Sequence, residues 1–317
     1  MIYDDSMAQH LCLWDQSYPE CPERYTEVIE RCREMKLIER CKELKPRQAI
    51  REEILMVHTE EHFQLLEATK DCKDEGKMEQ LSSNYDAIYI HPTTFDLSLL
   101  ACGSTIELVD SIIEGESQNG MAIIRPPGHH AMKAEFNGYC FFNNVAVAAK
   151  HAIDIKGVKR ILIVDWDVHH GQGTQQAFYD DPRVVYFSIH RFEHGTFWPN
   201  LRESDFDAIG KDAGEGKNIN VPLNKVGMTN ADYLAIFQQL LMPVAIEVIF
   251  IFLAIFSSIS RAFAEFSQFQ PELILVSAGY DAALGCQEVS SARAVINFWI
   301  FFQFLVPTRA DFRVMRL

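Results

Sequence analysis

The sequence predicts an α/β protein with a mostly parallel sheet that helices cover on both faces. Two observations lead to this fold class. Up to about residue 115 the chain mixes charged and apolar positions at helical spacing, and from residue 121 short apolar runs end in Gly, Pro or Asp. Near-continuous β-branched strands that alternate with helices are typical of parallel strands buried on both faces.

The helices follow from the spacing of apolar residues. One is expected over Tyr25–Cys32, after Pro22, because a first helical turn tolerates proline. A second is expected over Leu97–Ile113, and a third, over Asn144–Ile155, lies between the first two strands.

Four short runs rich in Ile, Leu and Val predict buried strands, at residues 121–124, 160–164, 184–189 and 272–276. In parallel sheets, ligands bind just beyond the carboxyl ends of the strands. The residues that follow each strand are therefore the candidates for function.

Composition limits the class of function. The 317 residues carry 29 Lys and Arg against 44 Asp and Glu, a net charge of -15, and 48% of them are hydrophobic. These values describe an ordinary globular chain, and the absence of repeats or linkers favours one domain. The negative charge disfavours direct nucleic-acid binding and favours a basic substrate, such as a lysine-rich tail or a polyamine.

The eight cysteines form no C-x-x-C pair, and Met1–Asp5 lacks the pattern of a signal peptide. We therefore expect reduced thiols and a cytoplasmic protein, with the nucleus as a second compartment.

Histidine or aspartate follows each predicted strand. The four strand ends carry Gly128-His129-His130, Asp165–Gly171, Ser188-Ile189-His190 and Ser277–Asp281. Each cluster taken alone is also typical of capping or turn residues. Their joint occurrence at one edge of a sheet favours a metal site.

The cluster after the second strand has the clearest geometry. Alternate residues of an extended chain face the same side, which groups Asp165, Asp167 and His169. Asp167 and His169, joined by the distant Asp281, would supply two oxygens and one nitrogen and leave a fourth position open, as in catalytic zinc sites. A second metal would need a carboxylate at position 171, which is Gly, so one metal is favoured.

The pair His129-His130 suits proton transfer near neutral pH. Asp165 is a candidate to hold one imidazole and Gln172 to orient the other. Three aromatic residues are candidates for an apolar channel, with core packing as the alternative explanation: Tyr139, Phe197 and Trp198. The histidines without such neighbours are expected to be structural or exposed: His10, His58, His62, His91, His151 and His194.

Together these motifs resemble the zinc-dependent histone deacetylase family. The matching strings are Arg125–Ala131, Gly138–Asn144, Asp165–Gln175 and Ser277–Ala282. Within the family the chain resembles class IIb, and in particular the first deacetylase domain of the tandem-domain tubulin deacetylase. The strings that support this are residues 11–15, 22–24 and 194–199. The polyamine-deacetylating member of class IIb is a close alternative.

The resemblance implies a three-layer αβα fold of the arginase/deacetylase type and hydrolysis of acetyl-lysine amides in proteins such as tubulin and histones. It implies Zn²⁺ on Asp167, His169 and Asp281, with His130 as general base and His129 as its tandem partner. Asp165 would be the carboxylate behind that partner. The remaining implied residues line the substrate channel (Gly138, Tyr139, Trp198) or bind a structural K⁺ (Asp165, Asp167, His169, Ser188 and Ile189).

Two Phe- and Ile-rich segments depart from the family pattern. We interpret residues 1–286 as the catalytic domain with an atypical insertion at 246–268, and residues 287–317 as a non-family tail that leaves the fold incomplete. Neither segment has the ~18–20 uninterrupted apolar residues that a membrane span needs, so no membrane association is expected. Translated non-coding sequence or an aberrant gene model would explain both.

The family completes its site with the tyrosine of a Gly-Gly-Tyr motif, and this sequence contains no Gly-Gly pair. Loss of such an electrophilic donor typically lowers the rate ~10²–10³-fold. Two alternatives to a protein lysine deacetylase therefore stay open: an acetylpolyamine deacetylase, and a catalytically silent module that binds acyl-lysine or a partner protein.

Overall fold

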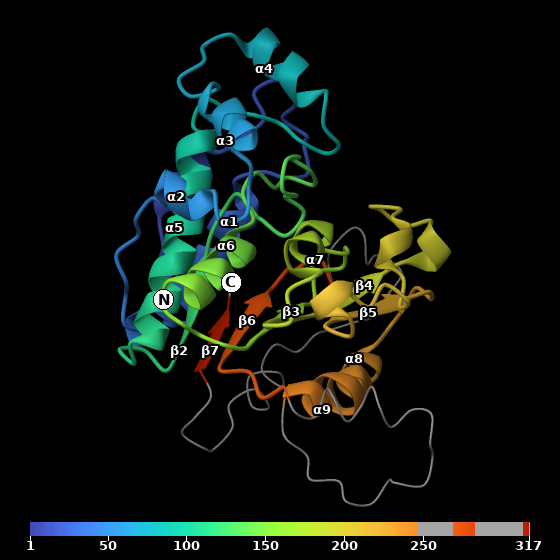
Figure 1. The fold of residues 1–317 in the computed structure, drawn as a ribbon. Coiled ribbons are helices and arrows are strands. Elements are labelled where there is room, and N and C mark those ends of the chain that lie inside the picture. The colour runs from blue at the N-terminus through green and yellow to red at the C-terminus, as the bar shows by residue number, and fades with distance from the viewer. Residues whose placement is uncertain (246–268, 283–312, 317) are drawn as a thin grey trace, which may run out of the picture. The chain divides into compact units, whose positions relative to one another are not determined.

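The computed structural model describes residues 1–245, 269–282 and 313–316 (Figure 1). The expected insertion at 246–268 lies outside the described residues, as does the expected tail apart from residues 313–316. The chain divides into two compact units. Among the described residues, the first contains Met1–Gly157, Gly171–Ala177 and the end of the chain from Met315, and the second contains Val158–His170 and those from Phe178 to Val314.

The second unit is built on a parallel sheet in the order β5-β4-β3-β6. Its strands are β3 (Ile161–Asp165), β4 (Val184–Arg191), β5 (Asn218–Leu223) and β6 (Leu273–Ser277). Asp165 pairs with Ser188 on one side and with Ser277 on the other. This register brings the residues that follow β3 and β6 to the same edge of the sheet.

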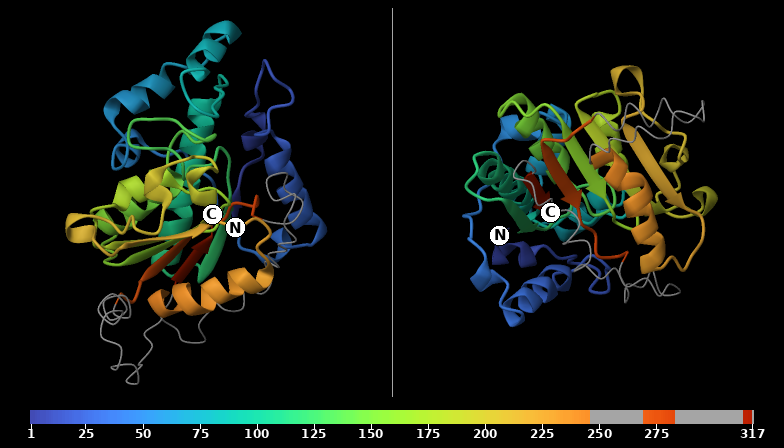
Figure 2. Two further views of the ribbon diagram at one scale, coloured as in Figure 1. Left: turned by 90° about the vertical axis from the view of Figure 1, so that its right-hand side faces the viewer. Right: turned by 90° about the horizontal axis from the view of Figure 1, so that it is seen from below.

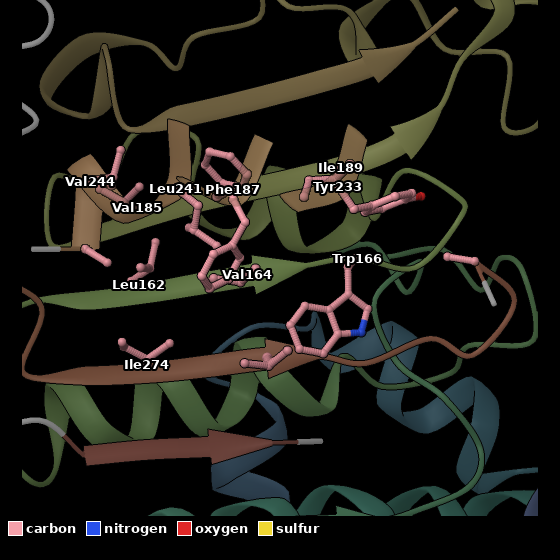
Figure 3. Packing of buried hydrophobic residues seen from close by; sticks show 14 of the residues in the cluster. Leu162, Val164, Trp166, Val185, Phe187, Ile189, Tyr233, Leu241, Val244 and Ile274 are labelled. Carbon is pink, nitrogen blue, oxygen red and sulfur yellow. The ribbon is translucent and has the colours of Figure 1, made fainter. Parts of the chain in front are cut away.

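One face of this sheet is covered by the helical run α8 (Asn230–Ile236), η6 (Phe237–Leu241) and α9 (Met242–Ala245) (Figures 1 and 2). Figure 3 shows Leu162, Val164, Val185 and Phe187 of the strands, with Leu241 of the helical run among the side chains of the same core. Full burial of one such side chain contributes ~1.5–3 kcal/mol. This core therefore fixes the strands whose carboxyl ends carry the polar residues of the candidate site.

Short 3₁₀ turns complete the second unit, at η3 (Glu193–Gly195), η4 (Arg202–Ser204) and η5 (Asp212–Gly214). The backbone of Arg313–Arg316 forms strand β7. Helix α7 (Gln172–Phe178) begins directly after the polar segment that follows β3.

The first unit is mainly helical. Its strands β1 (Ile2–Tyr3) and β2 (Asn119–Ile123) pair in parallel, and α5 (Thr94–Ile113) lies beside α6 (Asn144–Asp154) (Figure 1). Its other helical segments are η1 (Asp5–Gln9), α1 (Glu23–Glu34), η2 (Ile38–Arg40), α2 (Arg51–Ile54), α3 (Glu60–Glu67) and α4 (Glu75–Ser82).

The expected helices and strands are confirmed with small shifts of their ends. Strand β5 was not predicted, because Asn218, Asn220 and Pro222 interrupt the β-branched pattern. The structure explains these residues: the side-chain amides of Asn218 and Asn220 donate to the carbonyls of Ala208, Glu203 and Asp205, which tie the loop before β5 to the strand. Among the residues that the structure describes, no helix combines the length and apolarity needed to cross a membrane.

Candidate metal centre

Three of the residues predicted to bind metal meet in the second unit, beyond the ends of β3 and β6. Nδ1 of His169 lies 3.1 Å from Oδ1 of Asp167 and 3.1 Å from Oδ2 of Asp281. One ligand atom from each residue lies within 4.8 Å of the others. The structure thus joins two neighbours along the chain to an aspartate 112 positions later.

The distances and the donor set fit zinc. With bonds of ~2.0 Å, two ligand atoms of a tetrahedral zinc lie roughly 3.3 Å apart, close to the separations between His169 and each carboxylate. The side chains are largely buried, with exposures of 14% for His169, 13% for Asp167 and 12% for Asp281. Burial, together with the nearby charge of Asp167, raises the pKa of Asp281. A cation among these groups would remove that cost.

Backbone contacts hold the candidate metal ligands in place. The Val168 N–H donates to Oδ1 of Asp281, and the His169 N–H donates to Oδ1 of Asp167. Gly279 runs so close to this loop that a Cβ there would lie 2.0 Å from Oδ2 of Asp167. Only glycine fits at this position, which explains the Ala-Gly-Tyr-Asp sequence after β6.

Asp165, the last residue of β3, is fully buried and lies beside the cluster rather than in it. Its Oδ2 accepts a hydrogen bond from the Tyr186 hydroxyl at 3.0 Å, and its Oδ1 accepts one from the Asp167 N–H at 3.2 Å. The carboxylate therefore fixes the start of the loop that carries Asp167 and His169.

The aromatic residues of this unit surround the imidazole of His169. The Phe197 ring stacks on it at 5.3 Å and 12°, and the Trp198 ring meets it edge-on at 5.4 Å. Sequence reasoning missed Tyr233 of α8. Burial, with a further contribution from the charges of Asp281 and Asp167, raises the pKa of Tyr233 to about 12. A tyrosine at helical spacing carries no signal that separates it from a core residue.

His170 and His190 both make hydrogen bonds to Ser204 in the turn η4. Nδ1 of His170 contacts the Ser204 hydroxyl at 2.8 Å, and Nε2 of His190 donates to the Ser204 carbonyl at 2.8 Å. Burial lowers the pKa of His190 to about 4, so this imidazole is neutral near pH 7. The histidine that ends the third predicted strand motif thus anchors the loop after β4.

His129 and His130 belong to the first unit. Their rings are 3.8 Å apart, and Nδ1 of His130 donates to Oε1 of Gln172 at 2.7 Å. Gln172 is therefore the residue that orients His130, one of the two assignments that the sequence left open. Gly173 allows this approach, because a Cβ there would lie 2.2 Å from the Ala131 carbonyl oxygen.

Gly138 and Tyr139, predicted to line the channel, also belong to the first unit. Both adopt left-handed backbone conformations, with φ of 53° and 67°. Their N–H groups donate to the carbonyls of Asp86 and Ala87. The Tyr139 ring meets Tyr18 edge-on at 5.9 Å and lies 5.5 Å from the guanidinium carbon of Arg24. These contacts keep Tyr139 in a backbone conformation that is unfavourable for a non-glycine residue, as is common at binding sites.

The histidines that were expected to be structural include four that are almost fully buried: His10, His58, His62 and His151. His58 is satisfied on both nitrogens, since Nδ1 contacts the Met132 carbonyl and Nε2 accepts the Asn143 N–H. These contacts support the interpretation that His58 is part of the core.

A carboxylate–imidazole–carboxylate cluster at the ends of parallel strands is typical of α/β proteins with a catalytic metal site. Comparison with known proteins narrows this class. The histone deacetylase domain model matches residues 18–292, and the chain belongs to the histone deacetylase family. The fold class implied by the resemblance is confirmed by the solved HDA15 HD domain, with a TM-score of 0.77 and 31% identity over 92% of this chain and 76% of that one.

Relatives point to class IIb. Human polyamine deacetylase HDAC10 is 48% identical over 292 residues, which are 91% of this chain and 40% of the relative. The histone deacetylase 6 of Caenorhabditis elegans is 39% identical over 90% of this chain and 28% of its own length. The chain therefore spans less than half of each of these relatives.

Proposed function

We propose that residues 1–286 hydrolyse the amide of N-acetylated amines with one zinc ion. One observation carries this proposal. Asp167, His169 and Asp281 bring a possible metal-ligand atom each to within 4.8 Å of the others, with His169 3.1 Å from both carboxylates. Zinc bound there would polarise the acetyl carbonyl and make water a nucleophile near neutral pH.

His130 would act as the proton acceptor for the attacking water and then as the donor to the departing amine. Its hydrogen bond to Gln172 supports this role, because a proton on Nδ1 leaves Nε2 available as a base. Gln172 is neutral, so it orients the ring without raising its basicity as a carboxylate would. We assign His129 and Asp165 to a second histidine–carboxylate pair that assists His130.

From the resemblance to the family, we assign Gly138 and Tyr139 of the first unit and Phe197 and Trp198 of the second unit to binding of the substrate. Acetyl-lysine and acetylpolyamines both carry the acetyl group on an extended alkylamine chain, so this assignment is compatible with either substrate. The net charge of -15 favours both, because both sit in cationic molecules.

For the natural substrate we propose acetylated lysine in proteins, with tubulin and histones as the candidates and the cytoplasm and nucleus as the compartments. This follows the resemblance of the Leu11–Asp15 and His194–Pro199 strings to the tubulin deacetylase domain. Acetylpolyamine is the second candidate, and a specific observation favours it: relatives from four vertebrates that are 46–48% identical are named polyamine deacetylases.

A structural K⁺ is proposed on Asp165, Asp167, His169, Ser188 and Ile189. Asp165 and Ser188 support it, because they are paired in register and both are fully buried. Exchange of K⁺ for a bulky organic cation should then lower the thermal stability of the chain, and no change would reject the site.

The test is zinc content and turnover of the purified chain on two substrates, an acetyl-lysine peptide and N-acetylspermidine. Stoichiometric zinc with turnover supports the proposal, and the ratio of the two kcat/KM values decides between the substrates. Zinc without turnover of either would support the silent binding module, as the missing Gly-Gly-Tyr motif suggests. Absence of bound zinc would reject the proposal, and His169→Ala serves as the metal-free control.

A further inference from the structure

The imidazole of His169 stacks on the ring of Phe197, and the Phe197 ring is in turn contacted by Arg191. Phe197 stacks nearly parallel on the imidazole, with 12° between the planes and 5.3 Å between the centroids. Flat contact of this kind restricts rotation of the imidazole about its bond to Cβ, on which the direction of Nδ1 depends. The orientation of the nitrogen ligand therefore depends on where the Phe197 ring lies.

Arg191, the last residue of β4, holds the Phe197 ring. Its guanidinium carbon lies 4.2 Å from the Phe197 ring centroid, well within the range of a cation–π contact. Nε and Nη2 of Arg191 lie 2.5 Å from Oε1 of Glu193, so the guanidinium is itself fixed. Both side chains are largely shielded from solvent, with exposures of 23% and 29%, which limits screening.

The backbone explains how residues so close in sequence meet in this order. Glu193 and His194 adopt left-handed conformations, with φ of 48° and 57°, and Gly195 follows at 87°. This turn brings the chain back so that the Phe197 N–H donates to the Phe192 carbonyl. Two consecutive non-glycine residues in this region cost free energy, so the surrounding contacts must keep them there.

The same arginine also touches the loop that carries Asp167 and His169, through its main chain. The Arg191 N–H donates to the Val168 carbonyl at 2.8 Å, and the Val168 N–H donates to the carboxylate of Asp281. Substitution of the side chain leaves this backbone link in place. The contribution of the guanidinium can therefore be measured separately.

We propose that Arg191, anchored by Glu193, is a positioning residue for the metal centre: it fixes Phe197 and thereby the imidazole of His169. This inference rests on the proposed metal site and adds two residues to it. Sequence patterns could not single out Arg191 and Glu193, because a charged pair two residues apart at a strand end is typical of solvent-exposed turns.

The experiment compares Arg191→Met with Arg202→Met. Arg202 is the matched control, since it also pairs with a carboxylate of its own loop, Asp207, but is 69% exposed and makes no described contact with Phe197 or His169. Zinc affinity is measured against a competing chelator, and the visible spectrum of the Co²⁺-loaded chain reports the geometry of the ligands. Melting temperatures of the metal-free proteins report folding.

We expect Arg191→Met to weaken zinc binding about 3- to 10-fold and to shift the Co²⁺ bands, with Arg202→Met unchanged. Glu193→Gln should have a smaller effect of the same sign, and Arg191→Lys should recover part of the loss because it keeps the cation. In the zinc enzyme, kcat should fall more than KM rises.

Equal zinc affinity and equal Co²⁺ spectra for the two methionine variants would overturn the inference, as would Arg191→Lys behaving like Arg191→Met. A wild-type chain that binds Co²⁺ without turnover would reject the proposed activity alone, since the spectra still test Arg191. A wild-type chain that binds neither metal would reject the metal site and this inference together.

Discussion

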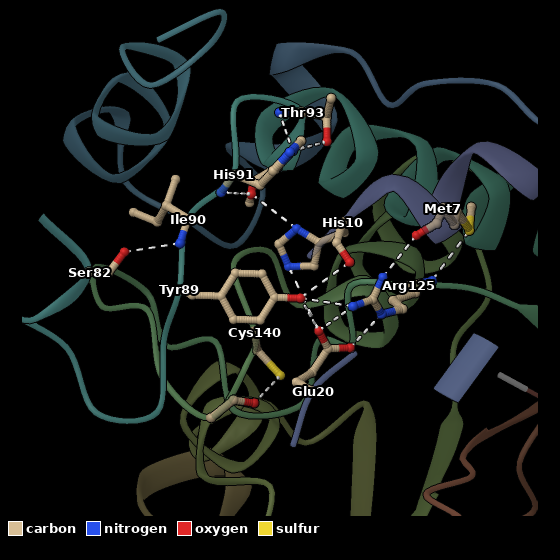
Figure 4. A network of polar contacts seen from close by, with 12 residues as sticks. Met7, His10, Glu20, Ser82, Tyr89, Ile90, His91, Thr93, Arg125 and Cys140 are labelled. Carbon is tan, nitrogen blue, oxygen red and sulfur yellow. Dashed lines mark hydrogen bonds and ion pairs between the residues drawn. The ribbon is translucent and has the colours of Figure 1, made fainter. Parts of the chain in front are cut away.

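Two buried polar clusters, one in each unit, are built in opposite ways. In the first unit Glu20 accepts from Nε and Nη2 of Arg125 at 2.5 and 2.6 Å and from the Tyr89 hydroxyl at 2.5 Å (Figure 4). In the second unit Asp167 and Asp281 face each other across one imidazole. The first cluster neutralises its charge internally and the second does not.

The difference separates structure from function. Arg125, Glu20 and Tyr89 are at most 3% exposed, and Arg125 also donates to the Met7 carbonyl, so every charged group in that cluster has a partner. Burial and the neighbouring Asp167 carboxylate raise the pKa of Asp281, and a bound cation would offset both effects. Buried groups of like charge without an equal opposite charge beside them indicate a ligand site. Buried charges that are paired with each other do not.

The largest effect should come from removing one carboxylate of the metal cluster. Asp281→Asn and Asp167→Asn should abolish zinc binding and lower deacetylation at least ~10³-fold, because the loss of several kcal/mol of charge stabilisation costs about tenfold per 1.4 kcal/mol. The metal-free variants should be at least as stable as metal-free wild type, since like charges no longer oppose each other. Chelator titration and chemical denaturation measure the two effects. A large loss of stability without metal would contradict the functional interpretation.

The fully paired cluster should respond in the opposite way. Arg125→Met leaves the Glu20 carboxylate buried without its cationic partner, which typically costs ~3–5 kcal/mol. Zinc affinity of the folded fraction should be unchanged. Urea denaturation of Arg125→Met, Glu20→Gln and the double variant forms a mutant cycle in which the double variant should recover part of the loss. If Arg125→Met reduced zinc affinity tenfold at wild-type stability, the cluster would not be purely structural.

The unfolding free energy should depend on pH through a third buried group, His58. Burial and the neighbouring His62 lower the pKa of His58 to about 3, well below its unfolded value of 6.5. Its neutral form is therefore favoured by folding, and this contribution is complete above pH 6.5 and is lost as the pH falls towards 3. Between pH 7 and pH 4.5 wild type should lose more stability than His58→Gln, as urea midpoints measure. Parallel losses in the two proteins would show that His58 does not titrate on unfolding.

The smallest effect is expected for an exposed pair. Arg202 makes a bidentate ion pair with Asp207, yet the two side chains are 69% and 49% exposed. Such pairs contribute ~0–1 kcal/mol, so Arg202→Met should change the unfolding free energy by less than about 1 kcal/mol. A change as large as that of Arg125→Met would mean that burial is a poor guide to the value of an ion pair here.

Periodicity predicted the strands at 160–164, 184–189 and 272–276 because each lies in a buried parallel sheet, where continuous apolar runs are required. It missed β5, whose asparagines serve a loop instead of the core. It also missed Tyr233, which is influenced by Asp167 and Asp281 at distant positions of the chain. It missed Arg191 because its contact with Phe197 depends on the left-handed turn at Glu193–Gly195, which periodicity does not reveal. Local patterns do not contain such partners.

The sequence by itself determined the local part of the metal centre. Asp167 and His169 lie on one side of a chain segment because alternate residues of extended backbone face the same way, and a buried apolar strand must precede them. Only the tertiary structure decided the rest. The register of β3 with β6 places Asp281 beside His169, 112 positions earlier in the chain. The turn at Glu193–Gly195 directs the chain so that Phe197 stacks on His169. The hydrogen-bond acceptor of His130 is Gln172 and not Asp165. These contacts depend on long-range packing, which fixes distances that no spacing along the chain specifies.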